Sequence, residues 1–151
     1  MKTAWAIKRY NELTLRELHD LYTLRTRVFI VEQKCIYDEI DGKDPVAIHV
    51  LCHSPSGDLL AYARILPPGA DGLPHIGRVV VRKDHRGTGL STELMDKTLA
   101  ALRDYFGSAR SALAAQSPLE SFYGRFGYTR IGPDHDWDGI MHVDMVREMD
   151  S

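Results

Sequence analysis

The sequence predicts a mixed α+β fold built around a central sheet. The first reason is the order of the expected elements: a strand, a helix, several consecutive strands, a helix, a strand, a short helix and two last strands. This order lacks the regular alternation of a doubly wound sheet. The second reason is composition, because 151 residues with 44% hydrophobic and 26% charged side chains suit one domain, 1–151, with its own core.

The first elements are a strand and an amphipathic helix. Residues 4–10 form the strand, and Thr14 to Glu17 reads as a capping box that opens the helix. Its apolar positions recur at helical spacing and include the stem of Arg25: Leu18, Leu21, Tyr22, Val28 and Phe29. Two strands follow, at about 46–52 and 59–65, and the turn formers of 54–58 join them into a hairpin.

A Pro- and Gly-rich loop, 67–74, then leads to a β-branched strand at about 76–82. The next helix has one apolar face and is expected to end at Gly107: Leu90, Leu94, Thr98, Leu102 and Tyr105. A strand near 110–115 precedes Ser117-Pro-Leu-Glu120, which predicts a capped short helix that closes at Gly127. The last strands, about 128–132 and 141–147, flank a loop over 132–139.

The segment 76–91 predicts an anion-binding cradle. After the strand, Gly87 and Gly89 allow the main chain to approach a ligand closely, and the start of the next helix adds N–H groups without intrahelical partners. The guest expected here is a pyrophosphate. The turn lacks the Gly-Lys-Ser/Thr of a nucleotide-hydrolysing loop and the Gly-x-Gly-x-x-Gly of a dinucleotide site. A strand-to-helix turn without a ligand is the alternative.

Charge and composition exclude other classes of partner. The formal net charge is −2, without the basic stripe that nucleic-acid binding requires, so a small soluble partner is expected. No apolar run approaches the roughly 18 residues of a membrane span, and we expect a cytoplasmic protein. Cys35 and Cys52 are expected to be free thiols. His49 and His53 would lie about 13 Å apart on a strand, too far to share a metal.

Two motifs at a characteristic separation resemble the GNAT acyltransferase superfamily. They are Val-x-x-x-x-Arg-Gly-x-Gly-x-Ser over 81–91 and Phe-Tyr-Gly-Arg-Phe-Gly-Tyr over 122–128. Flanking segments are similar, more narrowly, to its ElaA-like branch: 27–33, 37–42, 61–68 and 138–142. Ser91 replaces the usual glycine or alanine, and Gln116 replaces a frequent asparagine.

The resemblance implies a mixed, mostly antiparallel sheet of about six or seven strands with about three or four flanking helices. It also implies that acetyl-CoA lies between two parallel strands that splay apart, near 76–82 and 110–115, with no metal. The residues expected to bind acetyl-CoA belong to the strand near 76–82, to the cradle, and to the segment at and after the strand near 110–115: Val79, Val80, Val81, Arg86, Gly87, Thr88, Gly89, Leu90, Ser91, Gln116 and Tyr123. A homodimer is expected only by analogy.

The same resemblance suggests catalytic roles. His75 is the first candidate for the base that takes the amine proton, because the ordinary pKa of histidine suits the task. Tyr123 corresponds to a tyrosine thought to protonate the CoA thiolate, and a main-chain N–H of Val79 or Val80 would steady the carbonyl oxygen. The alternatives are an exposed loop histidine and a tyrosine that only packs against neighbouring aromatic rings.

The acceptor pocket is expected to include Glu32, Asp41, Arg64 and Asp138. Arg64 lies inside an apolar strand, which suggests a buried pair with Glu32 or Asp41. The acidic groups of 38–44 and 134–138 would attract a cationic amine, or are solvated loops: Asp38, Glu39, Asp41, Asp44, Asp134, Asp136 and Asp138.

The function expected is acetyl-CoA-dependent N-acetyl transfer to a primary amine of a small molecule or peptide, by direct attack on the thioester. One alternative is an enzyme like the acyl-homoserine-lactone synthases, which the region around Arg27 and Asp38 resembles. The other is a CoA-binding sensor or interaction module without catalysis.

Overall fold

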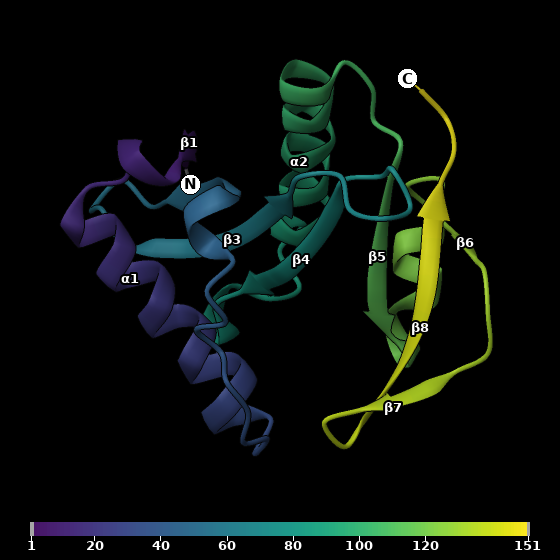
Figure 1. Ribbon diagram of the computed structural model, residues 1–151. Coiled ribbons are helices and arrows are strands. Elements are labelled where there is room, and N and C mark those ends of the chain that lie inside the picture. Colours follow the sequence, from purple (N-terminus) through teal and green to yellow (C-terminus); the bar gives the residue numbers. More distant parts are fainter. Residues whose placement is uncertain (1, 151) are drawn as a thin grey trace.

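The computed structural model describes residues 2–150, which form a sheet flanked by helices (Figure 1). The α-helices are α1 (Leu15–Arg25), α2 (Leu90–Phe106) and α3 (Glu120–Gly124). The strands are β1 (Ala4–Arg9), β2 (Ile48–His53), β3 (Leu59–Leu66), β4 (His75–Val81), β5 (Ser111–Gln116), β6 (Thr129–Arg130), β7 (His135–Trp137) and β8 (Ile140–Arg147).

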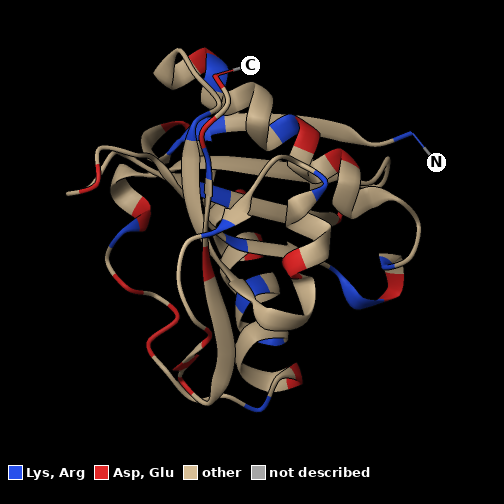
Figure 2. Cartoon of the chain, turned by 90° about the vertical axis from the view of Figure 1, so that its right-hand side faces the viewer, with Lys and Arg blue, Asp and Glu red and all other residues tan. Residues whose placement is uncertain are grey.

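The strands form one eight-stranded mixed sheet in the order β1-β2-β3-β4-β5-β8-β6, with β7 paired to β8. Every pairing is antiparallel except that between β4 and β5. This confirms the predicted mixed sheet with its parallel pair. Figure 2 shows Lys and Arg interspersed with Asp and Glu along the described chain. No helix within residues 2–150 is both long and apolar enough to cross a membrane.

Helices α1 and α2 pack on opposite faces of the first half of the sheet. Leu51 and Tyr62 join the apolar cluster that contains Leu21 of α1, whereas Val50 and Ala63 join the one that contains Leu94 of α2. Successive strand residues point to opposite faces, so neighbours in β2 and β3 serve different helices. The continuous apolar runs of these strands follow from burial on both faces.

The helix signals read from the sequence are mostly confirmed. The Glu17 N–H donates to Thr14 Oγ1 at 3.0 Å and the Thr14 N–H donates to Glu17 Oε1 at 2.9 Å, which is the predicted capping box. Gly107 adopts a left-handed conformation at the end of α2, with φ 76°, and its N–H donates to the Arg103 carbonyl. Beyond Arg25 the chain continues as a π-helical stretch, Thr26–Glu32.

Two predictions in the C-terminal part are wrong. Ser117 does not cap an α-helix: Ser117–Leu119 is a 3₁₀ turn with proline in its first positions, and α3 starts after it without a side-chain cap. The segment 132–139 is not only a loop, because it contains β7. Asp138 and Gly139 have φ values of 54° and 82°, the two positive values of a tight hairpin turn into β8.

Candidate active site

The parallel pair of strands opens the cleft. Strands β4 and β5 share the single register pair His75–Ala112, next to which the Ala112 N–H donates to the Pro74 carbonyl at 2.9 Å. All of β5 pairs with β8 on its other side. Beyond the shared pair, β4 and β5 therefore separate toward their carboxyl ends (Figure 1). The cleft between them has a volume of about 1080 Å³ and is lined by both strands.

The cradle lies where β4 leads into α2. Gly87 and Gly89 have φ values of 76° and 85°, and Gly89 directly precedes the first residue of α2. The loop is braced from within, because Thr88 Oγ1 donates to the His85 carbonyl at 2.7 Å and Arg86 Nε donates to the Val81 carbonyl at 3.0 Å. The first N–H groups of α2 have no intrahelical acceptor and carry the positive end of the helix dipole. This arrangement suits an anion.

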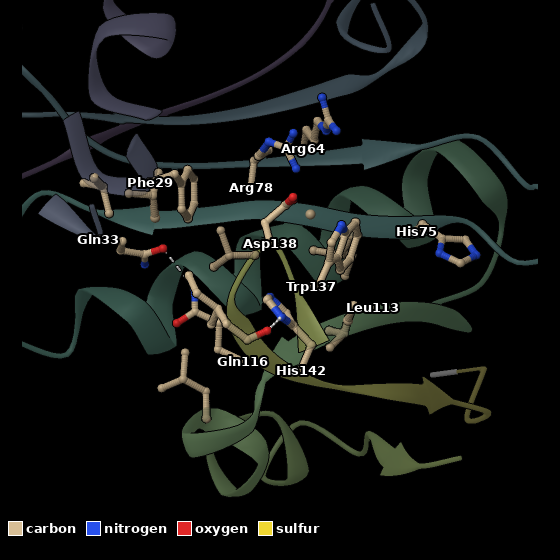
Figure 3. A pocket seen from close by; sticks show the side chains of 18 of the residues that line it. Phe29, Gln33, Arg64, His75, Arg78, Leu113, Gln116, Trp137, Asp138 and His142 are labelled. Atoms are coloured by element: carbon tan, nitrogen blue, oxygen red, sulfur yellow. Dashed lines mark hydrogen bonds between the residues drawn. The ribbon is translucent and has the colours of Figure 1, made fainter. Parts of the chain in front are cut away.

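The residues expected to bind acetyl-CoA divide into those that line the cleft and those in the turn that leads into α2. Seven line the cleft: Val79, Val80, Val81, Arg86, Ser91, Gln116 and Tyr123. The turn before α2 is exposed at Gly87, Thr88 and Gly89, whereas Leu90 is buried in the core. The Gln116 amide donates to Gln33 Oε1 at 3.3 Å, so an amide pair faces the cleft (Figure 3).

A bulge interrupts β4 in the middle of the cleft wall. Tyr62 pairs with Val80 and Arg64 pairs with Gly77, so Arg78 and Val79 together oppose Ala63. A bulge leaves one residue out of the ladder of hydrogen bonds. Arg78 has φ 52°, which costs a residue with a side chain roughly 1–2 kcal/mol. Sequence reasoning missed this bulge, and the glycine before Arg78 was its only local signal.

Tyr123 lies on α3 and is buried, with 6% of its surface exposed. Its ring packs edge-on against Phe122 and Tyr128, with centroids 5.1 and 6.3 Å away. No residue in the described chain forms a hydrogen bond with its hydroxyl, and the residue lines the cleft. Burial, with a smaller effect of Tyr128, raises the pKa of Tyr123 above its ordinary value. The phenol is therefore protonated at neutral pH.

Two histidines line the cleft. His75 Nε2 lies 2.7 Å from Asp71 Oδ2, and 44% of the His75 side chain is exposed. His142, which sequence reasoning missed, projects from β8 and is half-buried, with Nδ1 2.8 Å from the Ile140 carbonyl. A carbonyl only accepts, so Nδ1 carries the proton in the neutral ring and Nε2 holds the free lone pair. Figure 3 shows His142 near Gln116 and Trp137, and His75 apart from them.

A buried ionic cluster supports one wall of the cleft. The Arg25 side chain is 0% exposed, its Nε donates to Glu39 Oε2 at 2.6 Å, and its Nη1 donates to Asp44 Oδ1 at 2.7 Å. Its guanidinium also lies 5.4 and 5.6 Å from the rings of Tyr22 and Tyr62. Burial alone would lower the pKa of Arg25, but the bond to Asp44 and nearby negative charge raise it. Sequence reasoning gave Arg25 only an apolar stem.

Arg64 forms the pair expected for it, with Asp41. Its Nη1 and Nη2 donate to Oδ1 and Oδ2 of Asp41 at 2.9 and 2.5 Å, and Nη1 also reaches Asp44 at 3.1 Å. Burial acts to raise the pKa of Asp41, but the bonds and charge of Arg64 lower it overall. The pair therefore stabilises the fold above about pH 3.9, where an unfolded aspartate titrates, and this contribution is lost as the pH falls further.

The other acidic residues divide between the rim of the cleft and separate pairs. Glu32 pairs with Arg86 beside the cradle, with Oε2 2.5 Å from Nη1. Asp38 and Asp138 line the cleft, whereas the described lining does not include Glu39, Asp44, Asp134 or Asp136. The Cys35 thiol donates to the Asp138 carbonyl at 2.8 Å, which connects the β7–β8 turn to the opposite side of the cleft.

His49 and the two cysteines have structural surroundings. His49 is buried between the Tyr62 hydroxyl and the Asp44 carbonyl, at 2.6 and 3.0 Å. Cys35 and Cys52 are free thiols, and burial raises the pKa of Cys52 to about 11. Across residues 2–150, no group of three or more His, Cys, Asp or Glu side chains is arranged to hold a metal ion.

Known proteins resemble this chain in both sequence and structure. The family described as Acetyltransferase (GNAT) domain matches residues 17–149. An acyl-CoA N-acyltransferase from Pseudomonas aeruginosa is 40% identical and superposes with a TM-score of 0.92 over 97% of this chain and 99% of that one. For Escherichia coli ElaA the values are 36% and 0.90, over 97% and 100%. A UPF0039 protein of Schizosaccharomyces pombe is 38% identical over 94% of this chain and 95% of its own.

Proposed function

The chain belongs to the GNAT acetyltransferase family, in its ElaA-like branch, and from this premise we propose that it transfers an acetyl group from acetyl-CoA to a primary amine of a small molecule or peptide. The observation that carries the proposal is that one and the same cleft brings together Arg86 and Ser91 of the cradle, the β4 bulge and Tyr123. A pyrophosphate bound at the start of α2 would direct the rest of the CoA molecule along Val79, Val80 and Val81.

The proposed reaction is a direct attack of the amine nitrogen on the thioester carbon. The N–C bond forms, the C–S bond breaks, and the CoA thiolate leaves with a proton from the Tyr123 hydroxyl. A base takes the proton that the amine loses. The bulge frees a main-chain N–H of Val79 or its neighbour to stabilise the carbonyl oxygen as negative charge develops on it. A thioester is already reactive, so positioning supplies much of the acceleration.

Calorimetric titration with acetyl-CoA tests the proposal, with ATP and NAD as controls. We expect micromolar binding of acetyl-CoA alone, followed by acetylation of amines in an acceptor panel. Absence of acetyl-CoA binding would overturn the proposal. Binding without turnover on any amine would instead identify a sensor. Formation of a lactone from S-adenosylmethionine and an acyl donor would identify a homoserine-lactone synthase.

Replacing Tyr123 by phenylalanine is expected to lower kcat about 10²-fold, a typical loss when a general acid is removed. Acetyl-CoA affinity should change little, because the ring and its packing remain. Steady-state kinetics and calorimetry measure the two effects separately. Tyr128→Phe is the matched control: its hydroxyl lies 2.6 Å from Ser111 Oγ, so we expect a stability loss of about 1 kcal/mol and unchanged kcat. Equal kcat losses in both variants would refute the assignment of Tyr123.

His75 and His142 are the candidates for the base, and substitution of each by glutamine separates them. We expect the larger loss of kcat, about 10²-fold, from His142→Gln, because its Nε2 is free and His142 lies beside Gln116 in the cleft, whereas His75 lies apart (Figure 3). The pH–rate profile of the wild type should fall on the acidic side, and the variant that lacks the base should lose this fall. If the pH–rate profile is unaltered in both variants, the amine proton is accepted by water and by neither histidine.

A further inference from the structure

The part of the cleft left for the acceptor lies beyond the thioester. The cradle follows the last residue of β4, Val81, and the bulge at Arg78 lies three residues before Val81 within β4. If acetyl-CoA binds as proposed above, it occupies the cleft from the cradle to the bulge. The rest of the cleft is lined by Tyr37, Lys43, Arg64, Arg78 and His75. This region therefore receives the amine.

The guanidinium of Arg78 has an unused donor in this region. Its Nε donates to Glu39 Oε2 at 2.8 Å, and its Nη2 makes only long contacts, 3.4 Å to the Glu39 carbonyl and 3.3 Å to Asp41 Oδ2. Within residues 2–150 Nη1 donates no hydrogen bond. The side chain is 18% exposed and lies over the Tyr37 ring at 5.7 Å. Arg78 is thus held at one edge and open at the other.

The neighbouring carboxylates are already committed to other arginines. Glu39 Oε2 accepts from Arg25 at 2.6 Å as well as from Arg78, and Glu39 Oε1 accepts from the Tyr37 hydroxyl. Asp41 is held by both terminal nitrogens of Arg64. Arg78 therefore shares its partners and retains capacity for an anion of its own.

A second observation points to a ligand at the same wall. Arg64 is 3% exposed and lines the cleft, yet its Nε has no partner in the described part of the chain. Figure 3 shows Arg64 and Arg78 close together on this wall. Buried guanidinium nitrogens are usually paired, so the unpaired one indicates a missing polar group. The left-handed backbone of Arg78 is a further sign, because such a position favours glycine unless the side chain is used.

We propose that the amine acceptor carries a carboxylate, as an amino acid does, and that Arg78 binds this carboxylate. A planar guanidinium matches a carboxylate in geometry and charge, and Lys43 on the same stretch of the cleft adds positive charge. Asp38 and Asp138, which also line the cleft, would attract the ammonium group of the same zwitterion. The proposal rests on the acetyltransferase function above and names its substrate class.

Matched acceptors test the proposal on the wild-type protein. Lysine, lysine amide and 1,5-diaminopentane share a side-chain amine, and leucine, leucine amide and 3-methylbutylamine form a second series. We expect KM for the carboxylate member of at least one series to be about tenfold or more below that of its amide and its decarboxylated analogue. Equal values in both series would overturn the proposal, while transfer to any of these amines would leave the acetyltransferase function standing.

The variant Arg78→Gln assigns the effect to the side chain. The ratio of KM values between carboxylate and amide should fall to about one, because a neutral amide group cannot pair with a carboxylate as a guanidinium does. Arg16→Gln, which removes an exposed positive charge on α1, should preserve the ratio. A ratio that survives Arg78→Gln in folded protein would refute the role of Arg78.

Binding measurements test the proposal even if no acceptor in the panel is acetylated or the variant does not fold. Wild-type protein saturated with CoA is titrated with each acceptor by calorimetry. Tighter binding of the carboxylate member supports the proposal, and binding no tighter than that of the amide overturns it. Failure of CoA or acetyl-CoA to bind at all would instead refute the proposed function.

Discussion

Replacing Gly89 by glutamate is expected to weaken acetyl-CoA binding about 10³-fold or more. Gly89 precedes the first helical residue of α2 with φ 85°, and the space around its α-carbon is open. A glutamate carboxylate there would stand at the end of α2 that is proposed to receive the pyrophosphate. Like charges brought together cost several kcal/mol, and each 1.4 kcal/mol is tenfold in affinity. Calorimetric titration measures the change.

Gly107→Glu is the matched control for this substitution. Gly107 lies at the other end of α2 with φ 76° and equally open surroundings, so the strain of a left-handed glutamate, about 1–2 kcal/mol, is common to both variants. Thermal unfolding should therefore show similar losses, whereas only Gly89→Glu should lose acetyl-CoA affinity. Retained binding in folded Gly89→Glu would mean that acetyl-CoA does not use the cradle.

Arg25→Gln is expected to reduce the free energy of unfolding by about 3–5 kcal/mol, the usual cost of removing one partner from a buried ion pair. The arginine is 0% exposed, and its removal leaves charge on Glu39 and Asp44, which are 5% and 1% exposed. Urea denaturation measures the loss. The same change should also weaken the wall that positions Arg78, because Glu39 holds both arginines.

An exposed ion pair on the same helix provides the comparison. Arg16 pairs with Asp20 at 3.1 Å with 77% of its side chain exposed, so Arg16→Gln should change stability by no more than about 0.5 kcal/mol. Equal effects of the two substitutions would show that the buried cluster contributes no more than a surface pair.

The features that could be predicted from sequence depend on short spacings. The capping box at Thr14, the glycine that ends α2 and the cradle glycines each depend on a few adjacent residues, and all have the predicted backbone geometry. The hairpin turn at Asp138 and Gly139 has an equally local signal, the Asp-Gly pair, inside the segment 132–139 that is predicted as a loop.

The missed features depend on residues far apart in the chain. Arg25, Glu39 and Arg78 come together because α1, the acidic segment and β4 meet at one wall, and no periodicity in the sequence marks that meeting. The bulge at Arg78 is set by the register between β3 and β4, which depends on the whole pairing. Likewise, the position of His142 opposite Gln116 depends on the pairing of β8 with β5, which are far apart in the chain.

The single register pair between β4 and β5 also bears on the order in which the two halves of the sheet are completed during synthesis. Strands β1 to β4 pair in chain order, and α1 and α2, which cover this half of the sheet, both precede β5 in the chain. Contacts between residues close in the sequence form faster than contacts between residues far apart in the sequence. A nascent chain that ends at Phe106 therefore already contains the cradle and the bulged strand. Only translation of the last third adds Tyr123, His142 and strand β5, so the proposed anion site would be complete before the proposed catalytic groups are synthesised.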